Sequence, residues 1–121
     1  MLVGVDVINV DRFEKLINDE KFLNKYFTDY EKNYMLSRPH PNETMAGLYA
    51  SKEAFLKALG IGIGGGINLI DIEIRHEKSG RPNLRVVNSQ NNEVFQKFQI
   101  SKIDISISHT DSVATAMCIV Y

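Results

Sequence analysis

Val3-Gly4-Val5-Asp6-Val7-Ile8-Asn9-Val10 is a short, β-branched apolar stretch with an acid at its centre. This pattern predicts a strand over residues 2–10. A second apolar stretch, Ala50-Ser51-Lys52-Glu53-Ala54-Phe55-Leu56, has helical periodicity and carries a Lys-Glu pair. A carboxylate removed from water costs several kcal/mol unless a charge, a hydrogen bond or a metal compensates it. We therefore expect Asp6 and Glu53 to share one oxygen-ligand site for a hard cation.

Each acid also has an interpretation without a metal. Asp6 could be satisfied by neighbouring backbone groups or by an arginine, although acids are depleted in strands. Glu53 has Lys57 four residues later, in the orientation that stabilises an exposed helix. That pairing explains an exposed Glu53 well and a buried one poorly, so the residue pattern alone leaves both interpretations open.

Size and composition are those of one globular domain over residues 1–121. Apolar residues make up 44% of the chain and charged residues 24%, both ordinary for this class. The net charge of −1 gives no field that would attract nucleic acid or an anionic membrane. No apolar run approaches the roughly 18 residues of a membrane span, and Asp6 interrupts the early apolar stretch that a signal peptide would need. With one cysteine, Cys118, no disulfide framework can form within the chain, so we expect a cytoplasmic protein.

The predicted order of elements is an N-terminal strand, a helical block and an antiparallel meander, which is an α+β fold. Thr28 and Glu31 have the spacing of a capping box, and Gly60 is suited to end the longest helix. Residues 88–99 are polar and are left open between a loop and a helix near 93–98. Helices are predicted over 11–17, 19–27, 28–36 and 42–59, and later strands over 70–75, 83–87, 103–108 and 113–121.

The glycine-rich segment Gly60–Gly66 follows a helix, so it is neither a Walker loop nor a dinucleotide fingerprint. It is either a mobile connector or backbone that can approach a phosphate closely. His109 lies at a strand turn where several polar side chains converge, whereas His40 and His76 are expected to be ordinary surface residues.

Basic residues recur over the first two predicted helices. They form either a solvated helix face or a docking surface for an acidic protein. These residues are Arg12, Lys15, Lys21 and Lys25.

Five short motifs follow one another over nearly the whole chain. They are Gly4-Val5-Asp6-Val7, Phe27-Thr28-Asp29-Tyr30-Glu31, the segment from Ser51 to Gly60, Gly80-Arg81-Pro82, and Ser106-Ile107-Ser108-His109-Thr110. In this order they resemble the motifs of the holo-acyl-carrier-protein synthases, the small class of 4′-phosphopantetheinyl transferase. Each motif is weak alone, and the ordered set is specific.

The resemblance implies an α+β 4′-phosphopantetheinyl transferase-like fold that assembles as a trimer, with active sites between subunits. It implies transfer of 4′-phosphopantetheine from coenzyme A to a serine of acyl carrier protein, releasing adenosine 3′,5′-bisphosphate. Magnesium would be the cofactor, held by the carboxylates of Asp6 and Glu53.

Roles for further residues are carried over by position. Glu53 is the candidate base for the serine, with Asp6 also catalytic. Lys52 would either contact phosphate or compensate the two acids. The coenzyme A contacts would be Lys57, Gly60, Gly62, His109 and Thr110, and the carrier protein would face Arg12, Lys15, Lys21 and Lys25.

One position departs from the family pattern. Leu48 stands where the family commonly has an arginine associated with the coenzyme A phosphates. Two other functions remain as alternatives: a non-catalytic module that binds an acidic, carrier-like protein, and a small metal-dependent phosphohydrolase that uses the same two carboxylates.

Overall fold

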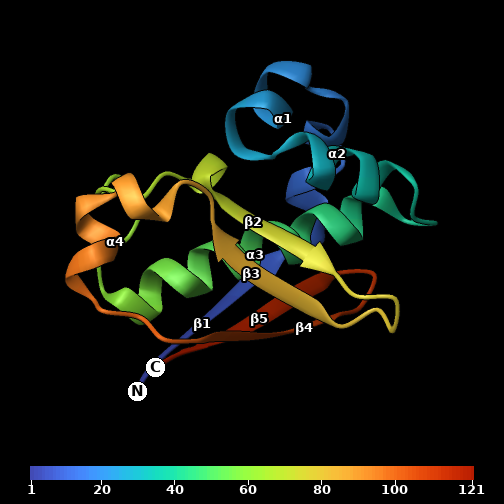
Figure 1. Cartoon of the computed structure of the whole chain (residues 1–121). Helices are drawn as coiled ribbons and strands as arrows, with labels where there is room; N and C mark the ends of the chain where they lie inside the picture. The colour runs from blue at the N-terminus through green and yellow to red at the C-terminus, as the bar shows by residue number, and fades with distance from the viewer.

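Two antiparallel sheets and four α-helices make up the computed structural model, which describes residues 1–121 (Figure 1). The larger sheet has the strand order β1 (Leu2–Asn9), β5 (Val113–Val120) and β4 (Ile103–His109). The smaller one is a hairpin of β2 (Ile72–His76) and β3 (Pro82–Val86). The helices are α1 (Glu20–Tyr26), α2 (Asp29–Leu36), α3 (Pro41–Leu59) and α4 (Glu93–Lys97). The predicted α+β class is confirmed, but the later strands do not form a single meander.

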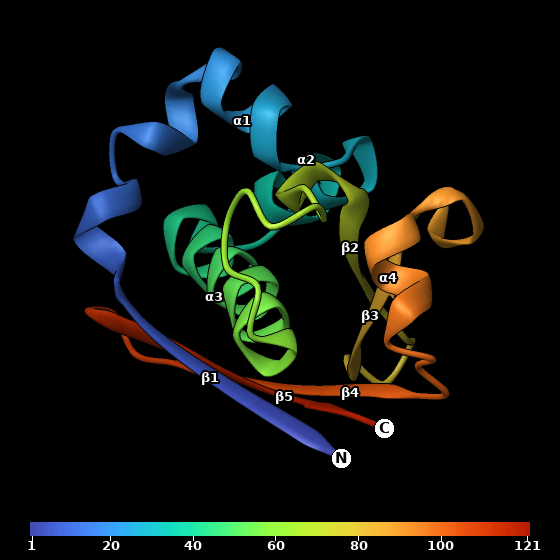
Figure 2. The same ribbon diagram turned by 90° about the vertical axis from the view of Figure 1, so that its left-hand side faces the viewer.

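The first strand of the chain pairs with the last one. β1 runs antiparallel to β5 from Leu2 opposite Val120 to Asn9 opposite Val113. The two ends of the chain therefore lie side by side at one end of the sheet (Figures 1 and 2). Along β1 the side chains alternate, and the inward-facing positions include Asp6.

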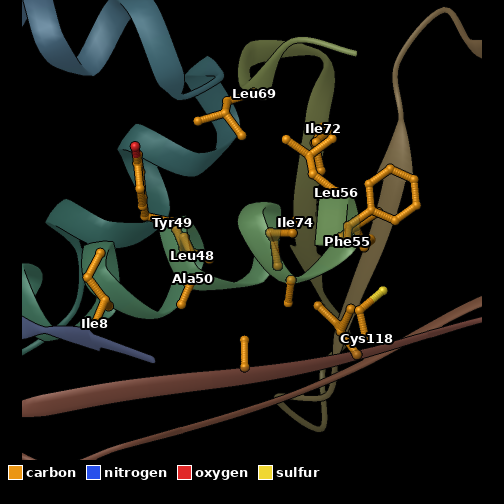
Figure 3. Close-up of a cluster of buried hydrophobic side chains, with 14 of the residues drawn as sticks. Ile8, Leu48, Tyr49, Ala50, Phe55, Leu56, Leu69, Ile72, Ile74 and Cys118 are labelled. Atoms are coloured by element: carbon orange, nitrogen blue, oxygen red, sulfur yellow. The ribbon is translucent and has the colours of Figure 1, made fainter. Parts of the chain in front are cut away.

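Helix α3 is the centre of the fold. Figure 2 shows it enclosed by the three-stranded sheet, the β2–β3 hairpin, and α1 and α2. It is buried on almost every side, because it contacts both sheets. Figure 3 shows the hydrophobic cluster in which Phe55 and Leu56 of α3 pack with Ile72 and Ile74 of β2 and Cys118 of β5.

Local signals in the sequence set most helix ends. The Thr28–Glu31 capping box is present, and Gly60 ends α3 with a φ of 72°, in the left-handed region that favours glycine. The helix expected over residues 11–17 is instead two short 3₁₀ segments, Val10–Phe13 and Leu16–Asn18. Residues 88–99 hold a 3₁₀ turn and α4. No helix is both long and apolar enough to cross a membrane.

Candidate active site

The facing sides of β1 and α3 bring together one aspartate, one glutamate and one lysine. Asp6 is buried on the inner face of β1, and the Lys57 ammonium donates a hydrogen bond of 2.8 Å to its Oδ1 atom. The other oxygen, Oδ2, is buried and has no hydrogen-bond partner. Glu53 lies one helical turn before Lys57, on the same side of α3. Two acids that are far apart in the sequence are therefore neighbours in the fold.

The environment of Glu53 makes its carboxyl group hard to ionise. Burial, the larger cause, and the negative charge of Asp6 together raise the pKa of Glu53 to about 7. The positive charges of Arg12 and Lys57 act in the opposite direction. The hydrogen bond that Lys57 donates to Asp6 raises the pKa of Lys57. The charge of Asp6 thus opposes ionisation of Glu53, and a cation shared by the two carboxylates would relieve this opposition.

The donor set formed by Asp6 and Glu53 fits magnesium. A buried carboxylate oxygen without a partner is costly, and a metal ion is one of the few groups that can satisfy it. No third acidic, histidine or cysteine side chain converges on the pair. Magnesium commonly takes one or two carboxylates and completes its shell with water and substrate phosphates, whereas a structural zinc site would need four protein ligands.

A cavity of about 220 Å³ opens beside Glu53 and Lys57. Gly62, which adopts a φ of 64°, lines it together with Leu56 and Ile63. Because Gly62 carries no side chain, its backbone is open to a ligand in the cavity. Gly60, predicted as a second contact, does not line the cavity and instead ends the helix.

Lys52 is a buried structural residue rather than a catalytic one. Its ammonium donates to Oε1 of Glu31 at 2.7 Å, to the carbonyl of Tyr26 at 2.6 Å and to that of Leu69 at 2.9 Å. All three of its protons are used, and the side chain is fully buried. Two roles were expected as alternatives for Lys52, and these contacts match neither: no proton is left for phosphate, and the charge is paired with Glu31 rather than with Asp6 or Glu53. Lys52 and Glu53 are adjacent in sequence, but side chains of successive helical residues point about 100° apart.

A larger cavity, of about 320 Å³, lies at the other end of α3. His109, predicted from the strand turn, lines it, and so do two histidines expected to be ordinary surface residues. Leu48, which stands where the family commonly has an arginine, lines it too. Arg38 is therefore the single arginine or lysine among the lining residues. The lining residues include Arg38, His40, Leu48, His76, Pro82 and His109. No sequence motif joins these segments, so only the fold reveals the pocket.

Two residues near the larger cavity have well-defined surroundings. His76 stacks on Tyr34 with 3.8 Å between ring centroids, and its Nδ1 atom is buried without a partner. Burial, together with the charge of Arg38, lowers the pKa of His76. Thr110, predicted as a ligand contact, does not line the cavity. Its hydroxyl accepts hydrogen bonds from the backbone of Ser112 and Val113, and so shapes the β4–β5 turn.

The four predicted docking residues are all exposed. They are Arg12, Lys15, Lys21 and Lys25. The guanidinium of Arg12 also lies 5.2 Å from the ring centre of Tyr49, which precedes Glu53 by one turn of α3. Arg12 therefore lies near the site, where its positive charge acts to lower the pKa of Glu53.

The sequence matches the family model of the 4′-phosphopantetheinyl transferase superfamily over residues 2–118. It is also 41% identical, over 96% of its length and 91% of the relative, to a holo-(acyl-carrier-protein) synthase of Syntrophus aciditrophicus. The chain belongs to the holo-(acyl-carrier-protein) synthases of this superfamily. It is therefore an enzyme, a phosphopantetheinyl transferase.

Similarity to other members of the family extends along the whole chain. A holo-(acyl-carrier-protein) synthase of Fusobacterium nucleatum is 37% identical over 99% of both chains. The crystal structure of the Helicobacter pylori holo-(acyl-carrier-protein) synthase in complex with coenzyme A superposes with a TM-score of 0.85. It covers 99% of this chain and 100% of that one at 29% identity. The family fold expected from the sequence motifs is thus confirmed.

Proposed function

We propose that this chain, as a single domain over residues 1–121, transfers 4′-phosphopantetheine from coenzyme A to a serine of acyl carrier protein with magnesium as cofactor. The observation that carries the proposal is the buried Oδ2 atom of Asp6, which has no partner and lies beside Glu53 and Lys57. An orphaned carboxylate oxygen is unfavourable in the free protein, so it indicates a ligand that arrives with the substrate.

In the proposed reaction the serine oxygen attacks the β-phosphorus of coenzyme A. The bond between the two phosphates breaks, adenosine 3′,5′-bisphosphate leaves, and the serine proton passes to Glu53. Glu53 would take this proton either directly or through a water molecule. Lys57 is more than half exposed, so its ammonium can turn from Asp6 toward the leaving phosphate. Magnesium, when held by Asp6 and Glu53, would neutralise the diphosphate charge.

A homotrimer is the proposed assembly, and the outer face of the three-stranded sheet supports it. Val3, Val5 and Val7 of β1 are each more than half exposed. Val5 stands opposite Met117 of β5, which is also exposed, so the apolar surface continues from β1 onto β5. No element of the chain covers this face (Figure 2). A continuous exposed apolar surface is typical of a protein interface, and we propose that further copies of the chain cover it.

Active sites between subunits would explain why the chain has two separate cavities. The cavity beside Glu53 and the one beside His109 share no lining residue. The nearest lining residues on α3, Leu48 of one cavity and Glu53 of the other, are five residues apart, or about 7.5 Å along its axis. In the proposed trimer, His109 of one subunit completes the coenzyme A site that Glu53, Lys57 and Gly62 begin on the next.

Acyl carrier protein is the proposed macromolecular substrate, and it would dock on the exposed basic residues Arg12, Lys15, Lys21 and Lys25. An acidic partner on such a surface should bind in a salt-sensitive way, mostly through the association rate. We also propose a cytoplasmic setting, where the buried free thiol of Cys118 stays reduced.

Intact-mass spectrometry of apo carrier protein tests the function directly. Incubation with the chain, coenzyme A and magnesium should add one phosphopantetheine arm, and Asp6→Asn or Glu53→Gln should abolish the gain. Glu93→Gln, which neutralises an exposed acid of α4, is the matched control and should react normally. Full activity of both site variants would overturn the metal assignment. Carrier binding without a mass gain would favour a binding module, and hydrolysis of coenzyme A without carrier would favour a phosphohydrolase.

A further inference from the structure

Three histidines line the larger cavity, and the carboxylate of Glu43 faces two of them, His40 and His109. Glu43 lies in the first turn of α3 and does not itself line the cavity. Its Oε1 atom is 3.3 Å from Nδ1 of His109, and its Oε2 atom is 3.7 Å from Nδ1 of His40. The carboxylate is only 15% exposed. These three side chains do not converge as the ligands of a metal ion would.

The contact with His109 is the shorter of the two. It places the Nδ1 atom of His109 toward Glu43 and the Nε2 atom away from it. A lone pair on Nδ1 would be repelled by the carboxylate, so Nδ1 is the nitrogen that carries the proton. The Nε2 atom, at the other side of the ring, is then left for a ligand in the cavity. A carboxylate behind a functional histidine commonly selects its tautomer and holds its ring in this way.

The position of Glu43 is well suited to such a role. Acidic side chains are stabilised in the first turn of a helix, where the backbone N–H groups are unpaired. The backbone of α3 therefore holds the Glu43 carboxylate in place. His109, in contrast, lies at the exposed end of β4, and its side chain is 44% accessible. Without Glu43, none of the contacts found for His109 would hold its imidazole ring.

We propose that Glu43 is a positioning residue that orients His109, and selects its tautomer, for coenzyme A binding. This inference rests on the proposed function, because it takes His109 as a coenzyme A contact. His76 gives an internal contrast: it lines the same cavity and has no carboxylate partner, and its ring is held by stacking on Tyr34. Glu43 therefore orients the histidine on the β4 side of the cavity and does not contact His76 on the β2 side.

The first test reads the tautomer in the free protein. Long-range ¹H–¹⁵N spectra of histidine-labelled protein should show His109 with its proton on Nδ1 in the parent and a mixture of tautomers in Glu43→Ala. Glu43→Gln keeps an oxygen acceptor at the same place and should largely restore the parent pattern. An unchanged His109 pattern in Glu43→Ala would overturn the inference without touching the proposed function.

The second test is a double-mutant cycle on coenzyme A binding by calorimetry. Glu43→Ala and His109→Ala should each weaken binding about tenfold, the order expected when one hydrogen bond to a charged group is lost. The double variant should be no weaker than His109→Ala alone, since the two act through one contact. In turnover, Glu43→Ala should raise KM for coenzyme A and change kcat less than twofold, and Glu43→Gln should recover most of the loss.

The outcomes separate the two proposals. If the parent protein does not bind coenzyme A, the proposed function fails. If the parent binds and His109→Ala is impaired but Glu43→Ala is not, only the role of Glu43 fails. Additive losses in the double variant would also reject it, because they would show that Glu43 acts independently of His109. Glu93→Ala removes an exposed first-turn acid from α4 and should leave both readouts unchanged.

Discussion

Gly4 of β1 lies directly against the backbone of Ala54 in α3. A methyl group at Gly4 would overlap the carbonyl oxygen of Ala54 and the amide of Ala58. Backbone atoms cannot swing aside as a side chain can, so β1 would have to move away from the helix. This close contact sets how near Asp6, two residues along β1, comes to Glu53.

Gly4→Ala should therefore lower both stability and activity. We expect a loss at or above the upper end of the ~1–3 kcal/mol typical of overpacking, and a clear drop in magnesium affinity. Urea unfolding and magnesium titration measure the two effects. Gly47→Ala is the comparison, because its added methyl meets only the movable side chain of Ile107, at 3.0 Å. Equal losses in the two variants would contradict this account.

Asp6→Asn should separate function from stability. The amide has the shape of the carboxylate but removes the buried charge that has no partner on Oδ2, and Lys57 is exposed enough to be hydrated instead. The metal-free variant should melt at or above the temperature of the parent. Magnesium should raise the melting temperature of the parent, as a ligand of the native state does, and leave that of the variant unchanged. A variant that magnesium still stabilises would remove Asp6 from the metal site.

The raised pKa of Glu53 predicts how the metal-free protein responds to pH. Since the pKa is about 7 in the folded protein and 4.5 ordinarily, the folded state binds the proton more tightly than the unfolded state. The stabilising contribution is fully present below about pH 4.5 and is lost as the pH rises toward 7. Melting curves in EDTA should show this slope in the parent and a smaller one in Glu53→Gln. Identical slopes would mean that another group titrates here.

Lys52→Met tests the buried ion pair with Glu31. Burial lowers the pKa of Lys52 and raises that of Glu31, so the ionised pair depends on the hydrogen bonds that each partner makes. Removing one partner of such a pair costs about 3–5 kcal/mol. Urea unfolding should show that loss for Lys52→Met and very little for Lys97→Met, which removes an exposed lysine of α4. A mild effect of Lys52→Met on folding with a large effect on kcat would restore the catalytic role.

The sequence predicted the local features of the fold better than the assembled ones. The Thr28–Glu31 capping box and the end of α3 at Gly60 depend on neighbouring residues and were predicted correctly. The pairing of β1 with β5 depends on the two ends of the chain, and no short-range pattern encodes it.

The site shows the same division. Asp6 and Glu53 were identified because an acid in an apolar element is conspicuous. Glu31 was missed because its role in capping α2 already accounted for it, whereas the same carboxylate also binds Lys52 and the amide of Ile74. The histidines of the larger cavity come from separate segments, so their convergence could not be read from spacing.

Pairing the first strand with the last has a consequence for how the protein folds. Contacts between residues at opposite ends of a chain close the largest loop available and form slowly. During synthesis Asp6 is made long before β5, which is the only strand that pairs with β1. The carboxylate of Asp6 is therefore held in its final place only after β5 has been made, so the site is among the last parts of the fold to be completed.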